Sequence, residues 1–162
     1  MAEIINNYLS PTNFTISIEK LPNVEFFTQK IGIPGITSTP QELQSPLSTL
    51  YDYGAKIVYG ELSTSMIIDE DMNNYKEILD WIEGYAAPES STQNALREKI
   101  GFESDLICTI TNSHKNPNIR FTFKNCFPVG IGGVNLDVNV TDVAYASVDV
   151  TWRYDTFTME QL

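Results

Sequence analysis

Three features of this sequence carry side chains that could do chemistry: the acidic run Asp69–Asp71, the cysteines Cys108 and Cys126, and the single histidine, His114. Clustered carboxylates could bind a divalent cation, because hard cations prefer oxygen ligands. The run lacks the spaced ligands of a calcium loop, however, and it stands just before an amphipathic stretch. Acids there stabilise a helix start, because free backbone N–H groups point at them. We interpret the run as a helix cap and keep a metal site as the alternative.

The cysteines and the histidine form no catalytic pattern. Both cysteines lie in apolar, strand-like surroundings, which favours a reduced pair of core residues over a disulfide or a metal site. His114 lies in the polar turn Asn112–Asn118, with neither a cysteine nucleophile nor a G-x-S-x-G motif to serve. The segment Ile131–Gly133 lacks the G-K-[ST] ending of a phosphate loop. The sequence therefore predicts that the protein is not an enzyme and has no catalytic residue, no metal ligand and no cofactor.

The stretch Lys56–Gly84 predicts a strand that runs into the acidic turn and then into the one convincing helix of the chain. Apolar residues recur in the helical part at spacings of three and four, which predicts one buried face; they are Met72, Tyr75, Ile78, Leu79 and Ile82. The polar residues Asn74, Glu77 and Asp80 are predicted to face outward. Gly84 follows the last periodic residue and suits a left-handed C-cap.

Alternating apolar and polar residues predict β-strands in most of the remaining chain. We expect strands at Phe14–Ile18, Val24–Ile33, Leu106–Thr111, Ile119–Phe123, Val134–Val140 and Ala144–Tyr154. The third and fourth should form a hairpin, and the last two should belong to an antiparallel sheet with one buried face. The segment Cys126–Gly133 contains a proline and three glycines and is expected to break the sheet. A short helix is expected at 94–100.

The segment Thr37–Gly54 has two prolines and no hydrophobic period, and it still contains Leu and Tyr residues. A loop of this length is uncommon in a compact domain unless it has a function. It could pack back on its own domain. It could also be an arm that docks on a neighbouring molecule, because exposed Tyr and Leu suit interfaces.

The chain has 162 residues and a net charge of −11, which fits one domain with a core of its own. A hydrophobic fraction of 42% with 19% charged residues is typical of a globular protein rather than a disordered one. Only ten Lys and Arg are present, so a basic clamp for nucleic acid is disfavoured. No apolar run is long enough to span a membrane, and the start MAEIINNYLSPTN lacks the pattern of a signal peptide, which predicts assembly in a cytoplasm.

The order of these elements resembles the tail tube protein family of contractile-tailed bacteriophages, which shares a fold with the inner-tube protein of type VI secretion. The resemblance covers residues 13–157. Three local matches carry it: Asn13–Ile18 followed by Ile31–Ile36; the strand, acidic turn and helix of Met66–Ile82; and Phe127-Pro128 through Leu136-Asp137 to Val148–Tyr154.

The resemblance implies an α+β, mainly β fold, an antiparallel β-sandwich or half-barrel of tail-tube type with one packed helix and a long assembly loop. It implies a single domain over residues 1–162, with an N-terminal extension at 1–12 and an assembly arm at 37–54. The implied function is that of a structural virion protein whose rings, of six copies, stack into the inner tube of a contractile tail and conduct DNA during ejection. The implied partners are further copies of the chain and the tail sheath, baseplate and terminator proteins, with no membrane partner.

Two surfaces are predicted to serve this function. The inter-subunit arm is assigned the residues Pro46, Leu47, Leu50, Tyr51 and Tyr53, and the lumen is assigned Asn135, Asp137, Asn139 and Asp149. A lumen acidic on balance would let DNA pass without specific binding, because like charges repel phosphate. The alternatives are a tail terminator or baseplate tube-initiator protein of the same fold, or a monomeric β-rich ligand-binding module.

Overall fold

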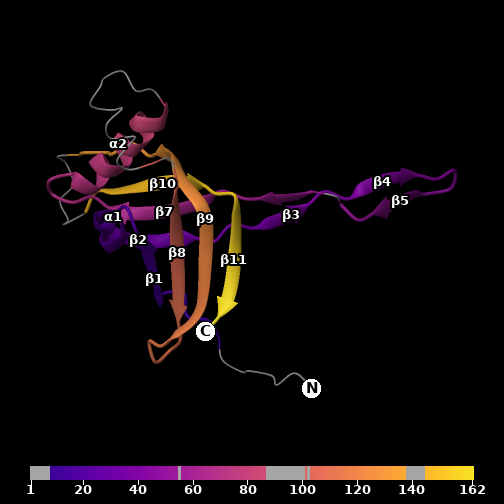
Figure 1. The fold of residues 1–162 in the computed structure, drawn as a ribbon, viewed down its shortest axis with the longest axis horizontal. Helices are drawn as coiled ribbons and strands as arrows, with labels where there is room; N and C mark the ends of the chain where they lie inside the picture. Colours follow the sequence, from indigo (N-terminus) through magenta and orange to yellow (C-terminus); the bar gives the residue numbers. More distant parts are fainter. Residues whose placement is uncertain (1–7, 55, 87–100, 102, 138–144) are drawn as a thin grey trace.

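The computed structural model describes residues 8–54, 56–86, 101, 103–137 and 145–162 (Figure 1). The described part is mainly β, as the sequence predicts, and it contains two helices, of which the first was not predicted. The elements are β1 Phe14–Ile18, α1 Pro22–Phe27, β2 Thr28–Gly32, β3 Ile36–Ser38, β4 Gln41–Gln44, β5 Thr49–Asp52, β6 Ile57–Tyr59, β7 Leu62–Ile67, α2 Asn73–Ala86, β8 Ser104–Thr111, β9 Pro117–Ile131, β10 Ser147–Arg153 and β11 Thr156–Gln161.

Two antiparallel layers, which share the long strand β9, make up the body. We call the layer β1-β8-β9-β11 sheet A and the layer β9-β10-β7-β2 sheet B. The first part of β9 pairs with β8 and β11, and its last residues, 127–131, pair with β10. Figure 1 shows the strands of sheet B crossing those of sheet A steeply, as in orthogonal sandwiches.

The shared strand corrects the prediction that Cys126–Gly133 breaks the sheet. β9 continues through this segment to Ile131 and bends from one sheet into the other. Asn125 has a φ of 54°, and the register with β10 shifts by one residue further on, which is how a bulge bends a strand. Pro128 is tolerated because this part of β9 is an edge strand of sheet B.

The core lies between the two sheets. Strand alternation buries one face of each; the buried set includes Ile16, Ile18, Leu106, Cys108 and Phe123 from sheet A and Leu62, Met66, Val148, Val150 and Trp152 from sheet B. The indole N–H of Trp152 donates to the hydroxyl of Thr64 at 2.8 Å, so its polar atom is paired inside the core. These contacts confirm the predicted strand Phe14–Ile18 and the predicted hairpin of β8 and β9.

Helix α2 packs through Ile78 and Trp81, and the Trp81 ring meets Trp152 edge-on with centroids 6.2 Å apart. Its ends differ from the prediction. The helix begins after Met72, whose φ is 55°, and it runs through a buried Gly84 to Ala86. The acids Asp69–Asp71 therefore lie in the turn before the helix and not in its first turn.

The outward placement of Asn74 is also wrong. Asn74 is fully buried, and its amide donates to the carbonyl of Ile67 at 2.7 Å while its oxygen accepts from the N–H of Asp69 at 3.2 Å. Among the predicted apolar stripe, Leu79 is only half-buried and Met72 is exposed. Compared with the prediction, the buried face of α2 is rotated toward Asn74, because the hydrogen bonds of this side chain join the helix to the end of β7.

Two predicted strands are corrected as well. The segment Val24–Ile33, predicted as one strand, begins inside helix α1. Pro22 lies in the first turn of this helix, where backbone N–H groups have no partner within the helix, so the missing N–H of proline costs no hydrogen bond. The described part of Val134–Val140 is not a strand, and Leu136 is 84% exposed. Strand β10 begins at Ser147, and β11 follows it without having been predicted. The helix expected at 94–100 lies outside the described residues.

Candidate assembly surfaces

A two-stranded arm projects far from the body (Figure 1). Its inner part is β3 paired with β6, and its outer part is β4 paired with β5, with Pro46 and Leu47 in the connection at the tip. This corrects the prediction of a loop without secondary structure. The sequence did not predict these strands because both faces of the arm are exposed to solvent, so its strands lack the alternation of apolar and polar residues that indicates a buried face. A Cβ on Gly54 would collide with the carbonyl oxygen of Thr39, so the two strands need a glycine there to lie this close.

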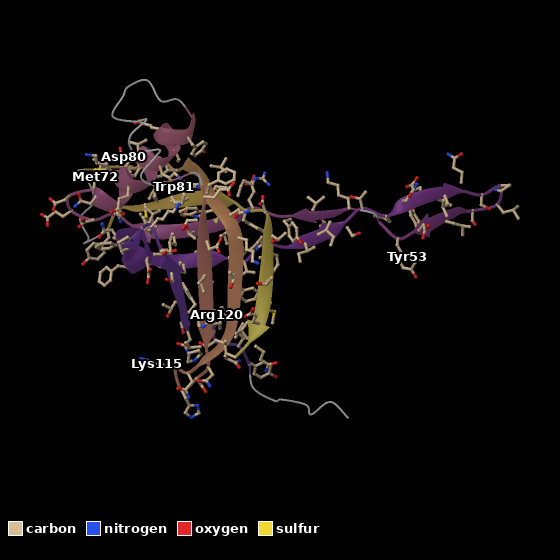
Figure 2. All side chains as sticks on the ribbon, viewed as in Figure 1. Tyr53, Met72, Asp80, Trp81, Lys115 and Arg120 are labelled. Carbon is tan, nitrogen blue, oxygen red and sulfur yellow. The ribbon has the colours of Figure 1, made fainter. Side chains whose placement is uncertain are left out.

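The arm exposes all five residues that the sequence assigned to an inter-subunit contact. Leu47 is 97% exposed at the tip, and Leu50 and Tyr51 are more than half exposed on β5. Figure 2 shows Tyr53 on the arm, well away from the body. Leu43, opposite Leu50 in the register, adds a further exposed apolar side chain that the sequence analysis missed. These five large apolar side chains on the outer part of the arm, with Ile36, Ile57 and Val58 exposed on its inner part, are typical of a surface that a partner covers.

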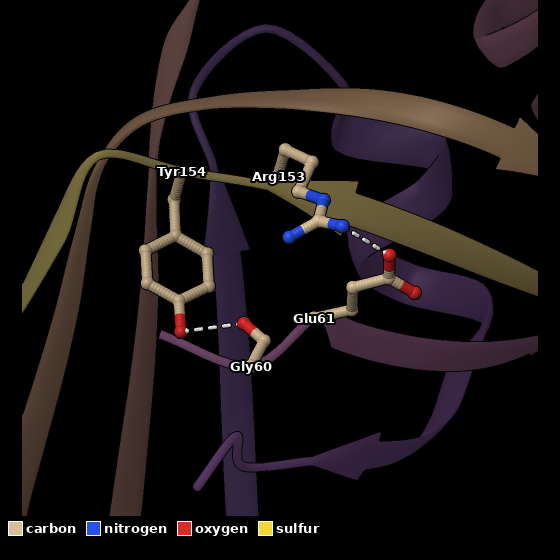
Figure 3. Close-up of polar contacts among 4 residues, drawn as sticks. All are labelled: Gly60, Glu61, Arg153 and Tyr154. Atoms are coloured by element: carbon tan, nitrogen blue, oxygen red, sulfur yellow. Dashed lines mark hydrogen bonds and ion pairs between the residues drawn. The ribbon is translucent and has the colours of Figure 1, made fainter. Parts of the chain in front are cut away.

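Aromatic and polar contacts fix the base of the arm to the body, and Figure 3 shows the polar ones. The Tyr154 hydroxyl donates to the carbonyl of Gly60 at 2.9 Å, and the Tyr59 ring packs on Tyr154 and on Phe157. Burial, with a smaller contribution from Tyr59, raises the pKa of Tyr154, so the hydroxyl keeps the proton that it donates. Tyr154 and Phe157 belong to the C-terminal part of the chain, and no sequence pattern linked them to the arm.

An ion pair closes the same corner. The Arg153 guanidinium lies 2.5 Å from the Glu61 carboxylate, and both side chains are about half exposed. Exposed pairs of this kind contribute roughly 0–1 kcal/mol to stability. The rigidity of the arm base therefore comes chiefly from the packed rings of Tyr59, Tyr154 and Phe157.

The outer face of sheet B carries small and polar side chains in register. Gly130, Thr151, Ser63 and Gly32 form one row across the four strands. Asp149, Ser65 and Lys30 form the neighbouring row, and Asp149 is exposed. On its other side, the buried residues of sheet B share one core cluster with those of both helices and sheet A. This face therefore carries mainly small and polar side chains, with Ile67 as an apolar member.

The four residues predicted for the lumen are not brought together on one strand face. Asp149 lies on the outer face of β10, as its alternation predicts. Asn135 and Asp137 are exposed in the segment that follows β9, and Asn139 lies outside the described residues. The sequence placed them together because 134–140 alternates like a strand.

The negative charge of the chain is concentrated around α2 rather than on the sheets. The strands of the two sheets carry the acids Asp105, Asp149 and Glu160 and the bases Lys30, Arg120, Lys124 and Arg153. The turn before α2 and the helix itself carry Asp69, Glu70, Asp71, Glu77, Asp80 and Glu83 against the single base Lys76. Figure 2 shows Asp80 at the α2 end of the body and Arg120 on sheet A.

The residues first considered for chemistry lie in the core or in turns. Cys108 and Cys126 are buried, free thiols, in agreement with the core interpretation. Burial raises the pKa of Cys108 to about 11, and burial together with the nearby charge of Asp105 raises the pKa of Cys126 to about 12. His114 is in the exposed turn after β8. Within the described ranges, no group of three His, Cys, Asp or Glu side chains is placed to hold a metal ion.

Comparisons with known proteins give one family and several proteins of similar fold. The family described as phage tail tube protein matches residues 3–160. The tube-sheath complex of an extracellular contractile injection system in its extended state contains a chain with a TM-score of 0.71 and 12% identity, covering 98% of this chain and 95% of that one. The tube-terminating cap of the anti-feeding prophage contains one with a TM-score of 0.72 and 12% identity, covering 100% and 97%.

A type six secretion system protein has a TM-score of 0.51 and 9% identity, covering 91% of this chain and 82% of that one. No curated protein sequence matches the chain. None of the described helices is long and apolar enough to cross a membrane. At these identities the structural likenesses show the fold alone.

Proposed function

This chain belongs to the phage tail tube protein family, and from that membership we propose that it is a structural protein whose rings, of six copies each, stack into the inner tube of a contractile tail. The observation that carries the proposal is the arm Ile36–Tyr59. It stands off the body, its base is packed against Tyr154 and Phe157, and its outer half exposes Leu and Tyr side chains. A rigid arm of this kind lets one ring hold the next.

The free edges of sheet B support ring formation. β2 and residues 127–131 of β9 are its two outer strands. An open edge with unpaired N–H and C=O groups is a hazard that a neighbouring copy removes by pairing with it. We place sheet B on the channel side, because sheet A and α2 lie together on its other side and the bulkier layer needs the larger circumference.

In this arrangement Asp149, with Ser65 and Lys30 in its row, faces the channel. The channel face is then hydrophilic and close to charge-balanced, and the negative charge around α2 lies outside it. DNA passes such a surface without specific binding, because few cations are available to hold phosphate. The acidic outer surface and the ring ends are the regions left for the sheath, baseplate and terminator partners, in a particle assembled in the host cytoplasm. No enzymatic activity is part of this proposal.

Removing the outer half of the arm tests the stacking role. Replacing Gln41–Asp52 by an Asn-Gly turn, which suits a two-residue hairpin, should leave a folded subunit that forms rings and no tubes in negative-stain images. A matched variant keeps the arm and changes only Leu47, Leu50 and Tyr51 to Ser. It should also fail to stack. Long tubes from either variant would show that the arm is not the stacking contact.

The channel face has its own test. Asp149→Lys adds a cation to an exposed position of β10, so assembled tubes should retain DNA in a way that salt weakens. Ser17→Lys, on the exposed face of sheet A, is the control and should retain none. Equal DNA retention by both variants would contradict the placement of sheet B on the channel side.

A second candidate function is a tube cap. The cap chain of the anti-feeding prophage matches this fold as well as the chain of the tube-sheath complex does, with TM-scores of 0.72 and 0.71. The purified protein distinguishes the two roles. Tubes that lengthen with protein concentration indicate a tube protein, and rings that never extend indicate a terminator or an initiator.

A further inference from the structure

A groove lies beside β2, an edge strand of sheet B. It has a volume of about 400 Å³. Apolar side chains line part of it: Leu9, Pro11, Phe14, Ile31, Ile33 and Ile110, with the buried thiol of Cys108. Polar side chains line the rest: Ser10, Asn13, Gln29 and Lys30. The groove is therefore amphipathic, and Lys30 is the one charged residue in this lining.

The single chain leaves this groove open. Figure 1 shows β1, β8 and β9 continuing past β2, so the core-facing side of sheet A has no second layer there. Ile33 is 42% exposed and Leu9 is 61% exposed. Apolar side chains left in water and bordered by polar ones are typical of a surface that binds a partner.

The outer part of the arm has a face that could fill such a groove. In the register of β4 with β5, Leu43 lies opposite Leu50 and Gln41 lies opposite Asp52. Residues two apart on a strand share a face, so these four side chains form one face, which we call the leucine face. Both leucines are about half exposed. The leucine face therefore carries an aliphatic pair with a single acid beside it.

The opposite face of the arm has a different character. Its cross-strand pairs are Glu42 with Tyr51 and Gln44 with Thr49. We call it the tyrosine face. It has no aliphatic pair, so the leucine face is the better complement to a groove with an apolar lining and one base.

The arm has the direction and the length to reach this groove in another copy. Figure 1 shows the arm extending outward from β2 and β7, roughly in line with the strands of sheet B. The groove follows the same direction, because consecutive residues of β2 line it. At about 3.3 Å per residue, the arm measures about 35 Å from Ile36 to the tip at Pro46, roughly twice the length of β2. When rings stack along this direction, the arm of one copy can lie along β2 of a copy in the next ring.

We propose that the leucine face docks in the groove of a copy in the next ring, with Leu43 and Leu50 on the apolar lining and Asp52 beside Lys30. The proposal rests on the stacked rings proposed above and names the surface that accepts the arm. Docking removes apolar side chains of both copies from water. It also gives each of the two charged side chains a partner of opposite sign, which fixes the register of the contact.

Exchanging the two charges tests this contact. Asp52→Lys and Lys30→Asp each bring like charges together, so each should raise the protein concentration needed for tube growth roughly tenfold or more. The double variant Asp52→Lys with Lys30→Asp restores opposite charges and should return this concentration close to the wild-type value. The control combines Asp52→Lys with Lys124→Asp, an equal change at an exposed residue outside the groove, and should restore nothing.

The two faces of the arm give a second measurement. Leu43→Ser with Leu50→Ser removes the aliphatic pair and should give rings that do not stack. The matched variant Tyr51→Ser with Glu42→Gln changes only the tyrosine face and should still give tubes in negative-stain images. Circular dichroism verifies that each variant folds like wild type.

The outcomes separate this contact from the stacking role of the arm. The groove proposal is overturned if the double charge variant does not recover, or if the tyrosine-face variant is the one that fails to stack. It is also overturned if Lys30→Asp leaves tube growth unchanged while removal of Gln41–Asp52 abolishes it, because the arm would then dock elsewhere. If wild type itself forms no tubes, the proposed function fails.

Discussion

Asn74 offers the sharpest test of how α2 is attached to the body. Its side chain is fully buried and makes three hydrogen bonds, to the carbonyl of Ile67 at 2.7 Å and to the N–H groups of Asp69 and Tyr75 at 3.2 and 2.8 Å. Asn74→Ala removes all three. A buried polar group left without its partner costs about 1–3 kcal/mol. Ile67 and Asp69 are each part-exposed, so water recovers some of this loss. We expect a decrease of about 2–4 kcal/mol in the free energy of unfolding.

The neighbouring residue provides a matched control. Asn73 is exposed and its amide makes one hydrogen bond, to the Asp69 carboxylate at 3.2 Å. Asn73→Ala should therefore change the free energy of unfolding by less than about 1 kcal/mol. Urea unfolding followed by the fluorescence of the two buried tryptophans measures both variants. Both variants are made in the subunit with the shortened arm, which prevents stacking, and are compared at one protein concentration, because ring assembly adds to the apparent stability. Equal effects of the two substitutions would refute the buried junction between β7 and α2.

Two further predictions concern the core. Ile78→Ala should lower the free energy of unfolding by about 2–5 kcal/mol because Ile78 is fully buried, whereas Leu79→Ala should cost less because Leu79 is half-buried. Urea titration of both variants measures the two effects. A larger effect at Leu79 than at Ile78 would contradict the assignment of the buried face of α2. The thiols of Cys108 and Cys126 should resist alkylation at pH 8 in the folded protein and react after unfolding. Their folded pKa values of about 11 and about 12 exceed the ordinary 9.0, so the unfolded chain loses protons first and stability should fall as pH rises above about 9. Unchanged stability between pH 9 and 11 would contradict burial of the thiols.

The sequence identified the local elements whose patterns have one buried face. β1, the β8–β9 hairpin and α2 were predictable because alternation of period two, or spacing of three and four, directly reflects burial on one side. The order of these elements was enough to indicate the family. The exposed residues of the arm could also be named, because Leu47 and Tyr53 stand in a polar segment without a period.

Other features depend on contacts between distant parts of the chain. The segment that begins at Val134 has the alternating pattern of a strand, but its described part pairs with no other strand. Alternation within one segment does not determine whether a neighbouring strand is available. Asn74 is polar and was predicted to face solvent. It is buried because the backbone at the end of β7 provides hydrogen-bond partners for its side chain. The proline and glycines in β9 predicted a break in the strand. In the structure they lie where β9 bends from sheet A into sheet B, and the sequence of β9 does not show that it pairs with strands of both sheets.

The sequence by itself determined the composition, the family and most of the elements, since these are set by residues close together along the chain. Only the tertiary structure decided how the edges of the subunit are arranged. It showed that the arm is a paired hairpin whose base packs against Tyr154 and Phe157. It also showed that sheet B ends at β2 while sheet A continues, which opens a groove beside this edge strand. The physical reason is that edges, registers and grooves are relations between strands, and a single strand's sequence does not contain them.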